Sequence, residues 1–153
     1  MHEDVGMVAK RRAAKVIIVD ERRRVLLLSG IDRTKPSVPP WWFAVGGGLE
    51  LGESPAEAAV REIYEETGLR LENPGPIVFT RRFEWIFEGT EIDQEEWYFF
   101  VQTRYFELSP AALTETESGT FRGHRWWSLE DLRSTKEAVY PDNLVEVIER
   151  QLR

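Results

Sequence analysis

The feature that most constrains the fold is a strongly delimited amphipathic helix in the first half of the chain. Ser54 can cap the free N–H groups at a helix start, Pro55 suits the first helical position, and Glu57 can complete a capping box. Gly68 can adopt the left-handed conformation that closes a helix. The sequence therefore predicts a helix over residues 54–67.

This helix is predicted to have one acidic face and one mostly apolar face. Glu62, Glu65 and Glu66 are spaced i, i+3 and i+4, which places their carboxylates on one side, within reach of one another. The apolar stripe, expected to pack on a sheet, consists of Ala59, Val60, Ile63, Tyr64 and Thr67. The acidic face is then expected to point outward, where only Arg61 offsets a repulsion of about 0.2–0.5 kcal/mol per exposed pair.

The rest of the chain alternates short apolar segments with turn residues, which indicates a mixed sheet and few helices. Residues 16–19 and 25–28 are predicted to form a hairpin, and residues 29–40 a loop. The loop leads to an aromatic run at residues 41–43, and further strands are expected at residues 76–80, 82–87, 97–103 and 125–127. A second helix is predicted over residues 143–152, with Asp142 as its cap, and residues 128–132 are expected to form a capped turn.

Length and composition fit a single domain over residues 1–153, because the 42% hydrophobic content can fill one core and no Gly/Ser-rich or Pro-rich linker divides the chain. The formal charge of −7 disfavours a protein whose main task is binding the nucleic-acid backbone, and residues 10–12 are interpreted as a solvated basic arm. The absence of cysteine excludes thiolate chemistry. With no apolar segment long enough to span a bilayer, the chain is expected to be cytoplasmic, without a membrane partner.

An acidic protein can process phosphates when divalent cations mediate the contact. Clustered oxygen ligands suit Mg²⁺ or Mn²⁺. Immediately before the helix, Gly46, Gly47 and Gly48 lack side chains, so the backbone there can approach a metal or a pyrophosphate closely. Singly, each glutamate is more often a solvated surface charge, and three glycines are more often a loop or bulge. Together they predict a metal site for phosphate chemistry.

The segment from Gly47 to Leu69 resembles the signature of the Nudix hydrolase family, which includes MutT-like enzymes. The signature is a Gly, five residues, a Glu, seven residues, then Arg-Glu-aliphatic-any-Glu-Glu-any-Gly-aliphatic. Every specified position is matched here, by Gly47, Glu53, Arg61, Glu62, Ile63, Glu65, Glu66, Gly68 and Leu69. The resemblance implies an α+β fold of the α/β/α sandwich type, in which a mixed sheet is flanked by helices.

The resemblance also implies a Mg²⁺- or Mn²⁺-dependent pyrophosphohydrolase. Glu62, Glu65 and Glu66 resemble the metal-binding carboxylates of the family, and the backbone carbonyl of Gly46 resembles an additional ligand. The implied reaction is attack of an activated water on one phosphorus of a diphosphate. The implied substrate is a nucleoside diphosphate linked to another group.

Supporting roles are implied for Glu53, near the metals, and for Arg61, which is expected to orient the glutamates by ion pairing. The catalytic candidates are thus Glu53, Arg61 and Glu66, and the substrate-binding candidates are Gly47 and Gly48. The general base stays open among Glu53, Glu95, Glu96, Glu115 and Glu117.

Several functions stay open within this reading. A nucleoside triphosphate, a nucleotide sugar or ADP-ribose, or capped RNA could be the substrate, although other nucleic-acid partners are not expected. A nucleotide-sensing module without turnover is the alternative from another class, but such modules often lose signature carboxylates that this chain retains. A structural domain that docks a basic partner is the third reading. A homodimer is compatible with the resemblance.

Residues outside the signature are weaker candidates. The aromatic residues could include a stacking platform for a nucleobase, but at least half of them are expected in the core: Trp41, Trp42, Phe43, Trp126 and Trp127. His124 is interpreted as structural rather than as an acid or base. Arg81 and Arg82 are interpreted as a solvated pair rather than as phosphate contacts.

Overall fold

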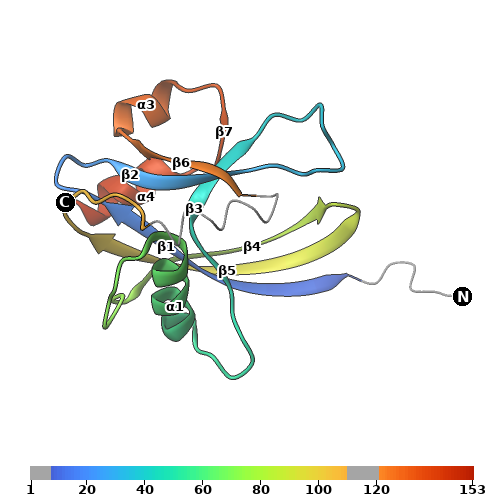
Figure 1. Cartoon of the computed structure of the whole chain (residues 1–153), viewed down its shortest axis with the longest axis horizontal. Coiled ribbons are helices and arrows are strands. Elements are labelled where there is room, and N and C mark those ends of the chain that lie inside the picture. The colour runs from blue at the N-terminus through green and yellow to red at the C-terminus, as the bar shows by residue number, and fades with distance from the viewer. Residues whose placement is uncertain (1–7, 110–120) are drawn as a thin grey trace, which may run out of the picture.

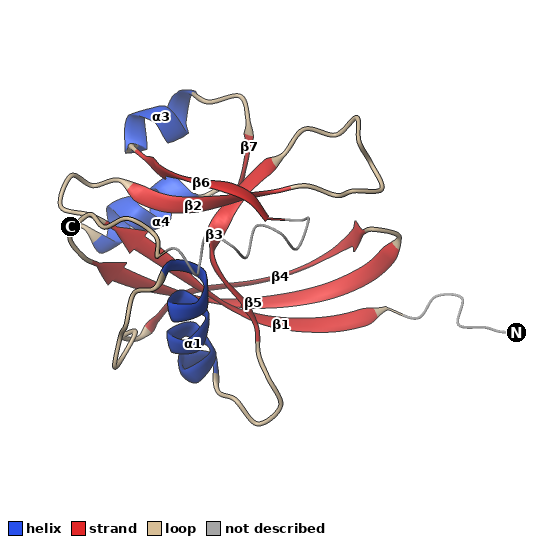
Figure 2. Ribbon diagram, viewed as in Figure 1, coloured by secondary structure: helices blue, strands red, loops and turns tan. Residues whose placement is uncertain are grey.

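Strand β1 runs through the middle of a seven-stranded mixed sheet in the computed structural model, which describes residues 8–109 and 121–153 (Figures 1 and 2). The strands are β1 (Ala9–Val19), β2 (Val25–Gly30), β3 (Trp41–Gly48), β4 (Ile77–Phe87), β5 (Thr90–Gln102), β6 (Phe121–Trp127) and β7 (Ala138–Tyr140). The helices are α1 (Pro55–Thr67), α3 (Leu129–Ser134) and α4 (Leu144–Gln151). This mixed sheet with helices on its faces confirms the predicted fold class.

Strand β3 divides its pairing between two neighbours, and this division curls the sheet. Its first half is antiparallel to β2, with Ala44 opposite Leu27, whereas its second half is antiparallel to β1, with Gly46 opposite Lys15. On its other edge β1 is parallel to β5 along its whole length. The end of β3 therefore lies where the part of the sheet formed by β2 and β3 meets the part formed by β1 and β5.

Alternation along β1 separates two hydrophobic clusters, one on each face of the sheet. Val16 and Ile18 belong to the cluster that also holds Ile63 of α1. Ile17 and Val19 belong to the other cluster, which holds Ile148 of α4. Each helix thus covers one face, and α1 is held against β1 and β3 rather than against the C-terminal helices (Figure 1).

The hairpin predicted from the first two apolar segments is confirmed, since β1 and β2 are antiparallel. Asp20 closes its turn, because its carboxylate accepts the backbone N–H groups of Arg22 at 2.9 Å and Arg24 at 2.8 Å. Strand β1 begins earlier than predicted, and the basic run at residues 10–12 is paired with β5. The interpretation of that run as an arm was wrong, although its side chains are exposed.

Other boundaries also differ from the sequence prediction. The two strands expected at residues 76–80 and 82–87 are one strand, β4, with an irregularity in its register near its start. Strand β5 begins at Thr90, so Glu95 and Glu96 lie inside it rather than before it. The short strand β7, parallel to β3, was not predicted. Strands β4 and β5 pair with each other along their length. This pairing extends both strands through polar residues that carry no local β signal.

The two C-terminal helices are close to their predicted positions. The turn at residues 128–132 is the first part of α3, where Ser128 Oγ accepts the N–H of Asp131 at 3.0 Å. Helix α4 begins one residue later than predicted, and its N-cap is Asn143, whose side chain makes no capping hydrogen bond. The prediction of Asp142 as the cap was wrong.

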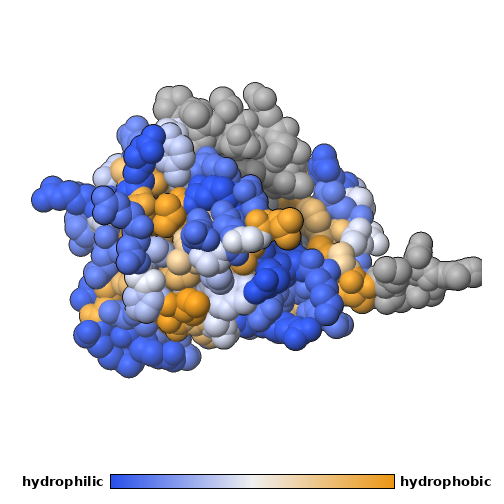
Figure 3. Space-filling view, turned by 90° about the horizontal axis from the view of Figure 1, so that it is seen from below, coloured by the Kyte–Doolittle hydropathy of each residue, from blue (hydrophilic) through white to orange (hydrophobic). Residues whose placement is uncertain are grey.

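The face shown in Figure 3 is predominantly hydrophilic, and its hydrophobic side chains form separate small groups. No helix in the described part of the chain is long and apolar enough to cross a membrane.

Candidate active site

Local capping fixes α1 as the sequence predicted. Ser54 Oγ accepts the N–H of Glu57 at 3.1 Å, and the Glu57 carboxylate accepts the N–H of Ser54 at 2.9 Å, which completes the capping box. At the other end Gly68 has φ 86° and donates to the carbonyl of Tyr64 at 2.8 Å. Both ends of the helix are thereby set without help from the rest of the fold.

The rotation of α1 about its axis differs in detail from the prediction. Its buried residues are Ala58, Ala59, Ile63 and Thr67. Tyr64 was expected in the apolar stripe but is 44% exposed, and the Arg70 guanidinium stacks on its ring at 4.3 Å. This rotation turns Glu62 and Glu66 toward β3, so the expectation that the acidic face points outward was wrong for these two residues.

The three glycines are the last residues of β3, not a loop. Gly46 has φ 140°, and a Cβ built there would lie 2.1 Å from the carbonyl oxygen of Ala14. A Cβ on Gly47 would lie 2.6 Å from the Glu62 carboxylate. The N–H of Gly46 donates to Glu66 Oε1 at 2.8 Å. The absence of a side chain at Gly46 lets β3 lie close to β1, and its absence at Gly47 makes room for the Glu62 carboxylate, so two carboxylates of α1 lie against the end of the strand.

Arg61 holds the acidic side of α1 together. Its Nε and Nη2 donate to the two oxygens of Glu53 at 2.7 and 2.9 Å. Its Nη1 donates to Glu62 at 2.9 Å and to Glu65 at 3.1 Å. Nη2 also donates to the carbonyl of Gly48 at 2.9 Å. One guanidinium therefore ties the helix, the preceding loop and the end of β3 into a single network.

The four carboxylates differ in environment. The Glu65 side chain is 52% exposed, whereas that of Glu62 is 14% exposed. Burial raises the pKa of Glu66 to about 7, and burial also raises the pKa of Glu62. The hydrogen bonds from Arg61 lower the pKa of Glu53 to about 2. Glu53 is thus held ionised, while Glu66 is the carboxylate that most needs a cation to ionise at neutral pH.

A second cation, Lys15, was missed by the sequence reading. It is 6% exposed, and its Nζ donates to the carbonyl of Ala44 at 3.3 Å and lies 5.0 Å from the ring of Phe43. Burial lowers its pKa, and Glu96, Glu66 and Glu62 oppose that effect. The available signal was alternation, because a β1 extended toward the N-terminus puts Lys15 in phase with the buried Ile17 and so predicts its burial. Its place beside Gly46 follows only from the pairing of β1 with β3.

Two of the candidates for general base lie on β5. Glu96 is 2% exposed and accepts hydrogen bonds from Tyr98 Oη at 2.7 Å, Arg81 Nε at 2.7 Å and the Gln94 amide. Burial opposes ionisation of Glu96, but Lys15, Tyr98 and Arg81 together bring its pKa below the usual range. The interpretation of Arg81 as a solvated side chain was therefore wrong, because Arg81 is paired with the buried Glu96. Glu95 is partly exposed on the same strand, and Glu115 and Glu117 lie outside the described residues.

The aromatic candidates are divided between core and partly exposed positions. Trp127 is buried, as expected for at least part of the set, and Trp42 packs against it edge to face. Trp41 meets the rings of Trp85 and Phe87 at 6.4 and 6.3 Å. None of these contacts involves the acidic side of α1.

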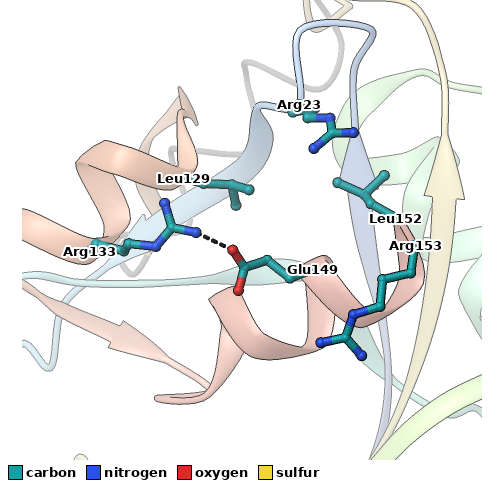
Figure 4. A pocket seen from close by; sticks show the side chains of 6 residues that line it. All are labelled: Arg23, Leu129, Arg133, Glu149, Leu152 and Arg153. Carbon is teal, nitrogen blue, oxygen red and sulfur yellow. Dashed lines mark hydrogen bonds and ion pairs between the residues drawn. The ribbon is translucent and has the colours of Figure 1, made fainter.

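A pocket seen in Figure 4 lies away from this region, between α3, α4 and the β1–β2 turn. Arg23, Arg133 and Arg153 line it, and Arg133 is paired with Glu149. Its lining contains no residue of the signature segment, so it is not the predicted site.

The donor set of the site fits a hard divalent cation, but not as a preformed cluster. In residues 8–109 and 121–153, no three Asp, Glu or His side chains are gathered as a metal-binding group. Arg61 donates to oxygens of Glu53, Glu62 and Glu65, so these oxygens are engaged by the guanidinium. Gly47 leaves room for the Glu62 carboxylate, and the available donors are all oxygen, as Mg²⁺ and Mn²⁺ prefer.

This curled mixed sheet, in which a glycine-ended strand faces an acidic helix tied together by an arginine, is consistent with the Nudix fold that the signature predicted. The comparison with family models agrees, since the model described as NUDIX domain matches residues 9–148. The chain therefore belongs to the Nudix family, as the signature predicted.

Relatives of known description include phosphohydrolases. The chain is 34% identical over 124 residues to diphosphoinositol polyphosphate phosphohydrolase 3-alpha of Mus musculus, a match covering 80% of this chain and 66% of that protein. It thus spans about two thirds of the length of that relative. It is also 28% identical over 137 residues to RNA pyrophosphohydrolase of Cereibacter sphaeroides, covering 89% of this chain and 70% of the relative.

Solved structures share the fold at low sequence identity. The MutT protein from Methanosarcina mazei Go1 has a TM-score of 0.61 at 21% identity, covering 94% of both chains. The Ap4A hydrolase of C. elegans has a TM-score of 0.61 at 21% identity, covering 96% of this chain and 100% of that one. Likeness at this level supports the architecture alone.

Proposed function

We propose that the chain is a pyrophosphohydrolase that uses Mg²⁺ or Mn²⁺ to cleave a phosphoanhydride bond in a substrate containing a nucleoside diphosphate. The observation that carries this proposal is the approach of the Glu62 and Glu66 carboxylates to the bare backbone at Gly46 and Gly47. Two carboxylates and a strand backbone without side chains, side by side, suit a metal that must also contact phosphate oxygens.

The residues of the site have distinct proposed roles. Glu62, Glu65 and Glu66, with the carbonyl of Gly46, hold the cation, which when bound neutralises phosphate charge and makes water a stronger nucleophile. The backbone at Gly47 and Gly48 contacts the diphosphate. Arg61 orients the glutamates and exchanges some of its present ion pairs when the cation binds.

The ion pairs narrow the choice of general base. Glu53 gives both of its oxygens to Arg61, and a carboxylate with a pKa of about 2 is a weak proton acceptor. We therefore assign Glu53 to positioning Arg61. Glu96 already accepts hydrogen bonds from three donors, and we assign it a structural role on β5. Glu95, Glu115 and Glu117 stay as the candidates for the general base.

The substrate is best sought among three groups. Nucleoside diphosphate derivatives follow from the family. A diphosphorylated inositol polyphosphate is a second candidate, because the mouse relative named for it is 34% identical. RNA with a 5′ polyphosphate or cap is a third, because the RNA pyrophosphohydrolase relative aligns over 89% of this chain. A screen of all three with Mg²⁺, with products resolved by chromatography, distinguishes them, and binding without turnover would favour a sensing module.

Metal binding is expected to stabilise the protein. Mg²⁺ or Mn²⁺ at 100 times its dissociation constant should add about 2.7 kcal/mol to the free energy of unfolding, because only the native state holds the glutamates of α1 against the end of β3. A rise in the thermal midpoint, measured against NaCl of equal ionic strength, checks this. An unchanged midpoint and no heat of binding at millimolar metal would contradict the proposed site.

Cleavage is expected at phosphorus. The site offers carboxylates, a guanidinium and backbone groups but no cysteine nucleophile, so water is the expected attacking group. With a confirmed substrate in ¹⁸O-labelled water, mass spectrometry should find the label on a product phosphate. Label on a sugar or inositol hydroxyl would remove phosphoanhydride hydrolysis from consideration.

A further inference from the structure

Lys15 is a buried cation whose hydrogen-bonding capacity is incompletely used. It lies on β1, opposite Gly46 on one side and Tyr98 on the other. An ammonium carries three donors, yet within the described part of the chain it makes one hydrogen bond, at 3.3 Å to the carbonyl of Ala44. That distance is long for an N–H donor and a carbonyl acceptor, so the bond is weak.

Three glutamates act on Lys15 electrostatically without forming an ion pair with it. The charges of Glu66 and Glu62 reach it from the acidic side of α1, and that of Glu96 reaches it from β5. No ion pair within 4 Å joins Lys15 to any of them in the described ranges. Burying a cation without a direct partner is unfavourable, and an apolar side chain at this position of β1 would pack more favourably.

The other cation of the site has little capacity left for a ligand. Arg61 already donates hydrogen bonds to Glu53, Glu62, Glu65 and the carbonyl of Gly48. Lys15, on the neighbouring strand, is the buried cation beside the glycines that has unused donors. It therefore lies where an anion brought to the end of β3 would find a positive partner.

Charge balance indicates when that anion is required. In the metal-free protein, Glu96 is the carboxylate that most favours the charged form of Lys15, and Glu66 and Glu62 add to its effect. A divalent cation bound to Glu62 and Glu66 would take up their negative charge and leave Glu96 as the remaining carboxylate whose charge offsets that of Lys15. A diphosphate would restore the balance, because its oxygens carry several negative charges and accept hydrogen bonds from an ammonium.

We propose that Lys15 binds substrate: its ammonium contacts a phosphate oxygen of the diphosphate held beside Gly46–Gly48, and this contact makes diphosphate and metal bind cooperatively. This inference rests on the proposed function, since it needs a diphosphate at that place. It adds a residue outside the signature segment to the site and gives it direct contact with the substrate.

The test uses the full chain and methylenediphosphonate, a diphosphate analogue with a non-hydrolysable bridge and no nucleoside. Isothermal titration with Mg²⁺ present compares wild type, Lys15→Met, Lys15→Gln and the control Lys136→Met, which removes an exposed lysine. Both Lys15 variants should bind the diphosphonate at least tenfold more weakly, and the control should match wild type. Mg²⁺ alone should bind the Lys15 variants as tightly as wild type, or more tightly, because a repelling charge is gone.

The outcomes distinguish a role of Lys15 in binding the diphosphonate from a purely structural role of Lys15 in β1. Glutamine can keep the hydrogen bond to Ala44 but not the charge, so wild-type affinity in Lys15→Gln would overturn the proposal and leave Lys15 a structural residue. Wild-type affinity in Lys15→Met would overturn it as well. If Lys15→Met does not fold, Lys15→Gln decides. If wild type itself shows no Mg²⁺-dependent binding of the diphosphonate while Mg²⁺ alone binds, the proposed phosphate chemistry fails, and this inference fails with it.

Discussion

Glu66→Gln is expected to lower kcat by about 100-fold or more while leaving the fold intact. The swap keeps the side-chain size, and the new amide oxygen can still accept the N–H of Gly46, which now bonds Glu66 at 2.8 Å. It removes the negative charge that the cation requires. Steady-state kinetics on a confirmed substrate, beside the exposed control Glu72→Gln, measures the effect.

Stability measurements sharpen this test. Without metal, the thermal midpoint of Glu66→Gln should equal or slightly exceed that of wild type, because a partly buried carboxylate beside Glu62 is lost. With metal the order should reverse, since wild type alone keeps the full ligand set. Glu65→Gln applies the same test to the most exposed of the three glutamates proposed to bind the metal. Near-wild-type turnover in both variants would show that this side of α1 is only a charged surface.

Gly46→Ala is expected to lower the free energy of unfolding by about 3 kcal/mol or more. The added Cβ would lie 2.1 Å from a backbone oxygen of β1, and φ 140° is itself unfavourable for alanine. Because β1 and β3 both carry the core at this point, neither strand can move aside cheaply. Urea denaturation followed by circular dichroism gives the change in free energy.

Gly52→Ala is the matched control for this prediction. Gly52 also has positive φ, at 81°, but nothing lies within 4 Å of the Cβ position. Only the backbone strain of a left-handed residue remains there, about 1–2 kcal/mol. Equal losses in the two variants would mean that the close approach of β1 and β3 at Gly46 contributes nothing, and that the geometry proposed for the site is wrong.

Local signals allowed α1 to be predicted with correct ends. Ser54, Glu57 and Gly68 act within a few residues of the backbone groups they satisfy, so their effect can be recognised without the fold. The strands were less predictable. Strand β5 extends through a polar stretch because it pairs with β1 and β4 on both sides, and partners distant in sequence leave no mark on the stretch itself.

The site likewise has features that the local sequence predicts and features that depend on tertiary packing. The spacing of the signature made Glu62, Glu65, Glu66 and Arg61 candidates, because a helical period places them on one side. It could not reveal which of them turn inward. The exposure of Tyr64 and the partial burial of Glu62 and Glu66 depend on how α1 rotates against β1 and β3, and that rotation is set by tertiary packing.

By itself, the sequence determined the family, the acidic helix and the kind of ligand that its oxygens suit, since these follow from residue type and spacing over a short segment. Only the tertiary structure placed the end of β3 against Glu62 and Glu66, tied Arg61 to Gly48, and brought Lys15 next to both Gly46 and Tyr98. The reason is distance along the chain: Lys15 lies 31 positions before Gly46, and only the pairing of β1 with β3 makes them neighbours.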